Sequence, residues 1–186
     1  MLTDFQRSKL THFFRLLDLD KNDTLELEDF SEIAEDLCQE LGYAFEGPDH
    51  KFLVDRCVGF YYMLLDEIPH QGSQVILLDE WLRFFDENVV NNKDHEFFDN
   101  FTEFMIGFFF DVFDENNDGY ISDEEYADMF LVYNIDIKYS GKAFVNLDVN
   151  KDGRLSRNEL IFAFETYISS DDPQEKGNWI FGDWRD

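Results

Sequence analysis

The sequence has few of the features that mark secreted or membrane proteins. Its 186 residues include only two cysteines, Cys38 and Cys57, which are too few for a disulfide framework and indicate reduced thiols. The first residues are polar, unlike a signal peptide, and neither end carries a lipidation motif. The most apolar stretch, residues 104–110, is far shorter than the ~20 residues that span a bilayer. We therefore expect a cytoplasmic protein without an intrinsic membrane anchor.

Basic residues are also scarce. The chain has 15 Lys and Arg against 42 Asp and Glu, so its formal net charge is −27. A field of this sign repels nucleic acids and anionic lipid surfaces, and it attracts cations. We therefore expect cations as ligands, no nucleic-acid partner, and a monomeric chain.

The motifs of common enzymes are missing as well. Neither Gly-x-Ser-x-Gly nor His-Glu-x-x-His occurs. The segment Ser140-Gly141-Lys142 lacks the earlier Gly and the following Ser or Thr of a phosphate-binding loop. The four His residues are scattered, and a pair of carboxylates is uninformative in so acidic a chain. We therefore expect no enzymatic activity.

Apolar residues at helical spacing predict an all-α fold. They make up 44% of the chain and include 22 Phe, which is enough for a core. Thr3 and Gln6 form a capping box that opens the first helix. Gly42 suits the end of a second helix over residues 26–41, and Pro48 suits the first turn of a third. Further helices are predicted over residues 78–88, 95–113, 123–133, 140–147 and 157–168.

The predicted helices flank acidic turns in pairs, and this internal repeat indicates four helix–loop–helix units packed compactly in two pairs. We expect residues 1–90 to form an N-terminal pair and residues 95–168 a C-terminal pair, with Asn91–Asp94 as the linker. Residues 169–186 form a tail that we expect to pack on the core. Four apolar residues of this tail are expected to fold back over a cleft: Trp179, Ile180, Phe181 and Trp184.

Two of the turns share a twelve-residue pattern of oxygen-bearing side chains, DENNDGYISDEE and DVNKDGRLSRNE. Oxygen ligands stand at positions 1, 3, 5 and 12, Gly stands at position 6, and position 7 offers its backbone carbonyl. The predicted ligands of the first turn are Asp114, Asn116, Asp118, Tyr120 and Glu125. Those of the second are Asp148, Asn150, Asp152, Arg154 and Glu159.

This spacing suits Ca²⁺, a hard cation that takes about 6–8 oxygens at roughly 2.3–2.6 Å. Alternate residues of a tight loop point inward, and the sharp turn at position 6 needs a positive φ that Gly adopts without steric cost. The glutamate at position 12 can supply two oxygens. Both turns therefore match the EF-hand calcium loop.

A third turn, DLDKNDTLELED, follows the pattern with two departures. Position 6 is Asp23 in place of Gly, and position 12 is the shorter Asp29, which favours one oxygen over two. Fewer ligands suit the six-coordinate geometry of Mg²⁺ as well as Ca²⁺. A metal-free, collapsed turn is the alternative. The predicted ligands are Asp18, Asp20, Asn22, Thr24 and Asp29.

The remaining turn, residues 69–80, is the second in chain order, and it has lost the ligand pattern. Pro69, Gln71 and Ser73 fill positions 1, 3 and 5, so no carboxylate remains among them. Ile76 still stands at position 8, where it is predicted to pair with Leu25 across a short bridge. We therefore expect about three Ca²⁺ sites, with Mg²⁺ competing mainly at the Asp18 loop.

Four loops with the second decayed, an aspartate at position 12 of the first, and the chain length resemble the sarcoplasmic calcium-binding protein and calexcitin group. Residues 2–7 and 176–182 are similar to the two ends of the calexcitins. The resemblance implies a compact all-helical protein, intracellular, that binds Ca²⁺ and Mg²⁺ and acts as a buffer or a neuronal sensor.

Three functions stay open at this point. The chain has only 4 Met against 22 Phe, and sensors expose Met-rich grooves, so a buffer is favoured. A calexcitin-like sensor of a channel or other membrane target is the alternative. Coelenterazine-binding proteins and photoproteins also look similar, and the aromatic residues could line a ligand cavity. The absence of a C-terminal Pro argues against a photoprotein.

Overall fold

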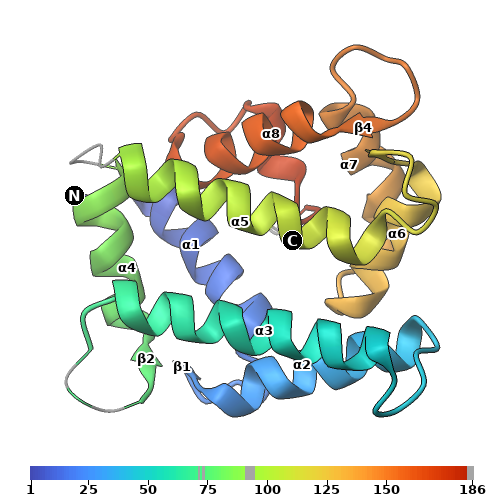
Figure 1. Ribbon diagram of the computed structural model, residues 1–186. Coiled ribbons are helices and arrows are strands. Elements are labelled where there is room, and N and C mark those ends of the chain that lie inside the picture. The colour runs from blue at the N-terminus through green and yellow to red at the C-terminus, as the bar shows by residue number, and fades with distance from the viewer. Residues whose placement is uncertain (71, 73, 91–94, 184–186) are drawn as a thin grey trace. The chain divides into compact units, whose positions relative to one another are not determined.

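The computed structural model (Figure 1) describes residues 1–70, 72, 74–90 and 95–183. Contacts among these residues define two units. One unit is Leu10–Asn88, and the other joins Met1–Lys9 to Val89–Asp186. The division therefore falls within the first helix. The predicted linker Asn91–Asp94 lies outside the described residues.

The N-terminal unit contains two helix–loop–helix segments. Helix α1 (Asp4–Leu17), which belongs to this unit from Leu10 onward, leads through β1 (Thr24–Leu25) to α2 (Leu27–Glu40). Helix α3 (Pro48–Glu67) leads through β2 (Ile76–Leu77) to α4 (Leu78–Phe85). A π-helical turn, Asp86–Val90, continues α4 where the sequence predicted ordinary helix up to residue 88.

The C-terminal unit repeats this order. Helix α5 (His95–Phe113) is followed by β3 (Tyr120–Ile121) and α6 (Asp123–Val132). After a 3-10 turn (Ile137–Tyr139) come α7 (Ser140–Leu147), β4 (Leu155–Ser156) and α8 (Arg157–Ser169), and α8 packs on α5 (Figure 1). A final 3-10 turn, Lys176–Trp179, packs on α7 and α8. The all-α prediction is confirmed.

The predicted helix signals are present. The Gln6 backbone N–H donates to Thr3 Oγ1 at 3.2 Å, and the Thr3 N–H donates to Gln6 Oε1 at 3.0 Å. Gly42 follows α2 with φ +68°, and Pro48 is the first residue of α3. Thr3 and Gln6 thus satisfy N–H groups that the start of a helix leaves unpaired. Pro48 has no N–H group that would need a partner there.

Within each unit, the two loops are joined by a two-residue antiparallel bridge. Leu25 pairs with Ile76 and Thr24 with Leu77, so the predicted Leu25–Ile76 pairing is confirmed. In the other unit, Ile121 pairs with Leu155 and Tyr120 with Ser156. All four residues at position 8 of the loops are fully buried: Leu25, Ile76, Ile121 and Leu155.

The tail forms part of the C-terminal unit's core. Ile180 and Phe181 are buried, and the Tyr126 hydroxyl donates to the Ile180 carbonyl at 2.8 Å. The Phe181 ring meets the Tyr167 ring edge-on at 5.1 Å between centroids. Trp184, the fourth apolar tail residue, lies outside the described residues.

A buried lysine ties the tail to the start of α1. Lys9 is fully buried, and its Nζ donates to the Ser170 carbonyl at 2.7 Å and to Asn178 Oδ1 at 3.0 Å. Gln6 Nε2 donates to the Ser169 carbonyl at 2.8 Å. These donors satisfy carbonyl groups at the end of α8 that have no partner inside the helix.

Candidate metal centres

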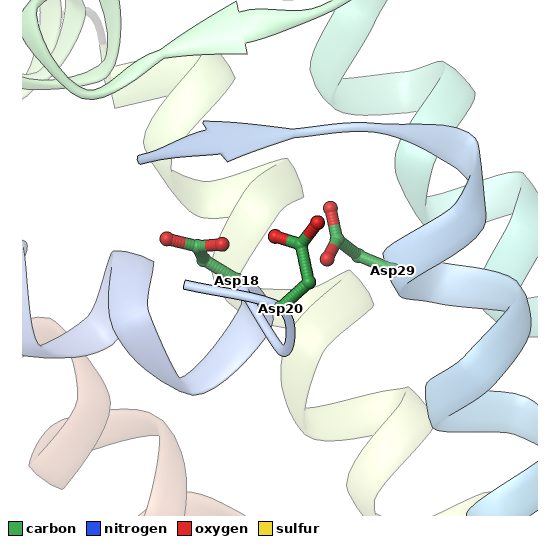
Figure 2. Close-up of side chains that lie close together, drawn as sticks. All are labelled: Asp18, Asp20 and Asp29. Atoms are coloured by element: carbon green, nitrogen blue, oxygen red, sulfur yellow. The ribbon is translucent and has the colours of Figure 1, made fainter. Parts of the chain in front are cut away.

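The loop between α1 and α2 brings three carboxylates together. Oxygens of Asp18, Asp20 and Asp29 lie within 4.8 Å of one another (Figure 2). Asp18 and Asp29 are buried, while Asp20 is exposed. Three hard oxygen donors at this separation fit a divalent cation such as Ca²⁺ or Mg²⁺.

The aspartate at position 1 organises each of the three loops that carry one. Asp18 accepts hydrogen bonds from the N–H groups of Asn22 at 3.1 Å and Asp23 at 3.0 Å. Asp114 accepts from the corresponding positions 5 and 6, Asp118 and Gly119, both at 3.0 Å. Asp148 does the same with Asp152 at 3.2 Å and Gly153 at 2.9 Å.

The acidic residue at position 12 also makes the same two bonds in all three loops. It accepts from the N–H of position 2 and from the N–H of position 9. Asp29 does so with Leu19 at 3.2 Å and Glu26 at 2.9 Å. The donors to Glu125 are Glu115 and Ser122, and the donors to Glu159 are Val149 and Ser156. The shorter Asp29 thus keeps the hydrogen bonds of a glutamate.

The backbone turns at two positions of each of these loops, although the sequence pattern marks only one. Position 6 has a positive φ in all three, at Asp23 (+62°), Gly119 (+80°) and Gly153 (+82°). Position 4 also has one, at Lys21 (+59°), Asn117 (+55°) and Lys151 (+60°). Asp23 therefore adopts the conformation that Gly normally supplies, at a cost of roughly 1–2 kcal/mol for an ordinary L-residue.

The Asp18 loop holds a further carboxylate at a position that the ligand pattern does not mark. Glu26 stands at position 9, where the other two loops have Ser122 and Ser156. Thr24 Oγ1 donates to Glu26 Oε1 at 2.8 Å, and Asn22 Nδ2 approaches the same oxygen at 3.4 Å. An acidic residue in place of serine at position 9 was the available signal.

Burial sets the electrostatics of the Asp18 loop. It raises the pKa of both Asp18 and Asp29, against the lowering effect of their backbone hydrogen bonds. Burial also opposes ionisation of Glu159, but hydrogen bonds from Ser156 and neighbouring backbone groups outweigh it and lower the pKa. A cation bound beside the two buried aspartates would act against this effect of burial and favour their charged form.

The two C-terminal loops bring fewer of their predicted acidic ligands close together than the Asp18 loop does. Among the residues that the structure describes, only the Asp18 loop brings three acidic groups within 4.8 Å. Of the two residues whose carbonyls are predicted ligands, Tyr120 is in the bridge and Arg154 directly precedes it, and the Arg154 guanidinium lies 3.6 Å from the Tyr120 ring centroid. Arg154 Nε also lies 3.6 Å from Asp152 Oδ2, so a predicted ligand already faces a cation.

The decayed loop keeps only part of the framework. The Leu77 N–H still donates to the buried Glu80 at position 12, at 3.0 Å. Pro69 offers no carboxylate at position 1, and Gln71 and Ser73 lie outside the described residues. The Tyr61 hydroxyl of α3 donates to the Gln74 carbonyl at position 6.

Comparisons with known proteins agree with this geometry. A family model described as "EF hand" matches residues 109–131 and 142–164, the two C-terminal loops with their flanking helices. The chain therefore has the EF-hand fold. It is 25% identical to calerythrin of Saccharopolyspora erythraea over 167 residues, which cover 90% of this chain and 94% of that protein.

Solved structures of calcium-binding proteins have a similar fold. The amphioxus sarcoplasmic calcium-binding protein matches with a TM-score of 0.80 and 16% identity, over 98% of each chain. The calcium-loaded coelenterazine-binding protein of Renilla muelleri matches with a TM-score of 0.74 and 18% identity, over 98% of this chain and 99% of that one. Among the described residues, no helix is long and apolar enough to cross a membrane.

Proposed function

We propose that the chain is an intracellular Ca²⁺/Mg²⁺ buffer with three sites. The sites are the loops Asp18–Asp29, Asp114–Glu125 and Asp148–Glu159. Their common hydrogen-bond framework supports this assignment, because the acids at positions 1 and 12 are placed alike in all three. Three ions add six positive charges and reduce the formal charge from −27 to −21, so binding should also stabilise the chain.

The buried tail is the observation that favours a buffer over a sensor. Sensor EF-hand proteins open an apolar groove for a target helix when Ca²⁺ binds. Here Ile180 and Phe181 cover apolar surface of the C-terminal unit, against Tyr126 and Tyr167. An internal segment therefore takes the place that a target would need.

The three sites are expected to differ in selectivity. The Asp114 loop has Glu125 at position 12 and no basic residue, and it should prefer Ca²⁺ most strongly. The Asp148 loop has the same ligand types, but Arg154 faces Asp152 and should weaken cation binding there. The Asp18 loop, with Asp29 at position 12, should discriminate least against Mg²⁺.

Apolar dye binding tests the buffer proposal. The metal-free chain is first titrated calorimetrically to count sites, and dye fluorescence is then followed in Mg²⁺ and after Ca²⁺ is added. A buffer gives three sites and little change in fluorescence. A large Ca²⁺-specific rise, with Ca²⁺-dependent recovery of a partner from a lysate, would instead support a sensor, and retention of an organic ligand would support a carrier.

Truncation after Ser169 provides a companion test. If the tail covers apolar surface, its removal should expose Tyr126 and Tyr167 and increase dye binding in either metal. Unchanged dye binding by the folded, truncated chain would remove the main support for a closed buffer.

A further inference from the structure

The decayed loop of the N-terminal unit is held by a side chain from outside the loop. The Tyr61 hydroxyl donates to the Gln74 carbonyl at 2.5 Å, just before strand β2. Tyr61 is 1% exposed, and burial raises the pKa of its hydroxyl, so it remains a donor at neutral pH. Gln74 stands at position 6, where the other three loops turn with a positive φ.

This anchor lies two residues from the bridge to the Asp18 loop. Ile76 and Leu77 of β2 pair with Leu25 and Thr24 of β1. Thr24 stands at position 7, the position whose carbonyl is a predicted ligand. The Tyr61 bond therefore fixes the strand that in turn fixes the Thr24 backbone.

Tyr61 also contacts the other end of the Asp18 loop. Its ring packs against Phe30 at 5.5 Å between centroids, and Phe30 directly follows Asp29 at position 12. One buried side chain thus supports both the bridge strand opposite Thr24 and the first turn of α2, which carries Asp29.

We infer that Tyr61 is a positioning residue for the metal site of the Asp18 loop, and that it replaces the ion the decayed loop cannot bind. In an active loop, a bound cation adds to the hydrogen bonds by which the acids at positions 1 and 12 hold the backbone. In the decayed loop, the Tyr61 hydroxyl holds the backbone without metal, so the Asp18 loop has a preformed partner strand. This inference rests on the proposed binding of a divalent cation by that loop.

Tyr61→Phe tests the inference because it removes the hydroxyl and keeps the ring that packs on Phe30. Tyr62→Phe is the matched control, since Tyr62 is the next residue, is 50% exposed, and loses the same atom. Both variants are made in a full-length chain that also carries Glu125→Gln and Glu159→Gln. In that background the C-terminal loops are weakened, and a calorimetric Mg²⁺ or Ca²⁺ titration reports mainly on the Asp18 loop.

Tyr61→Phe should lower the affinity of the Asp18 loop about fivefold, the factor given by a net hydrogen bond of ~1 kcal/mol. Tyr62→Phe should leave the affinity unchanged. Tyr167→Phe, which loses a buried bond to the Lys9 carbonyl, should lower thermal stability without changing this affinity. Equal affinities for Tyr61→Phe and Tyr62→Phe would overturn this inference and leave the proposed function standing. Absence of binding by the background chain would overturn both it and the proposed function.

Amide exchange of the unmodified chain gives a second test that needs no variant. Without metal, the N–H groups of Leu25 and Ile76 should already exchange slowly. Those of Ile121 and Leu155 should gain most of their protection only when metal is added. Fast exchange at both bridges in the metal-free chain would overturn the inference.

Discussion

In the C-terminal pair of loops, each loop closes on its own aspartate, and Gly119 and Gly153 turn the chain without strain. In the N-terminal pair, the Asp18 loop forms the same bonds with a strained Asp23 and a shortened Asp29, while its partner depends on Tyr61. Both pairs nevertheless end in the same two-residue bridge. The bridge therefore tolerates loss of ligands in one loop when another interaction holds that loop.

The largest expected effect is on metal affinity, and it compares position 12 of an active loop with position 12 of the decayed loop. Glu125→Gln removes charge and one of two ligand oxygens, and it should weaken Ca²⁺ binding at the Asp114 loop about a hundredfold, because ligand charge tunes EF-hand affinity over decades. Calorimetry would measure the loss. Glu80→Gln is the control, and it should leave the number of sites unchanged. A lost site in that variant would show that the decayed loop binds metal.

The next effect concerns the stability of the C-terminal unit, in which Lys9 donates hydrogen bonds at the end of α8. Lys9→Met should reduce the free energy of unfolding by about 1–3 kcal/mol, because buried carbonyl groups lose their donor. Denaturant unfolding would measure it. Asn146→Ala, which removes an exposed bond within α7, is the control and should cost much less. Equal losses would mean that the Lys9 bonds contribute little.

The same lysine gives a pH dependence. Burial lowers the pKa of Lys9 from 10.5 to about 8, although Asp171 and Glu175 act in the opposite direction. Between these two values the unfolded chain binds more protons than the folded chain, so stability gained from this group rises with pH. The difference in unfolding free energy between the parent and Lys9→Met should therefore increase from pH 8 to 10. A constant difference would contradict the lowered pKa.

A smaller change should bring the Asp18 loop closer to the C-terminal loops. Asp29→Glu lengthens position 12 and should raise the Ca²⁺/Mg²⁺ affinity ratio of this loop about tenfold, because a bidentate carboxylate suits the larger ion. Competition titrations would measure the ratio, with Glu125→Asp as the reciprocal variant. An unchanged ratio in both would mean that the length of position 12 does not set selectivity.

The smallest effect tests the backbone at position 6. Asp23→Gly should stabilise the metal-free chain by about 1 kcal/mol, since Gly adopts φ near +60° without the steric cost of an L-residue. Gly119→Asp should cost at least a similar amount, from backbone strain and from the added negative charge, because a Cβ there meets no atom within 4 Å. Thermal unfolding of the two variants would show whether the changes oppose each other.

The features that could be predicted from the sequence are those that depend on short-range patterns. The capping box at Thr3, the start at Pro48 and the Leu25–Ile76 pairing all follow from local spacing or from loop register. The Tyr61 bond to Gln74 could not be predicted in this way, because it depends on how α3 packs over its own loop. The Lys9 contacts join residues more than 150 positions apart, and no periodicity reveals them.

The bonds between the first turns of α1 and the end of α8 also have a consequence for synthesis on the ribosome. Gln6 and Lys9 are translated long before their acceptors Ser169 and Ser170, which follow 163 and 161 residues later. Because contacts so distant in sequence form late, the first turns of α1 in a nascent chain cannot complete these bonds until Ser170 has left the ribosome. A ribosome stalled shortly before Ser169 should therefore display a protease-sensitive segment around Gln6 and Lys9 that becomes resistant once the end of α8 has emerged.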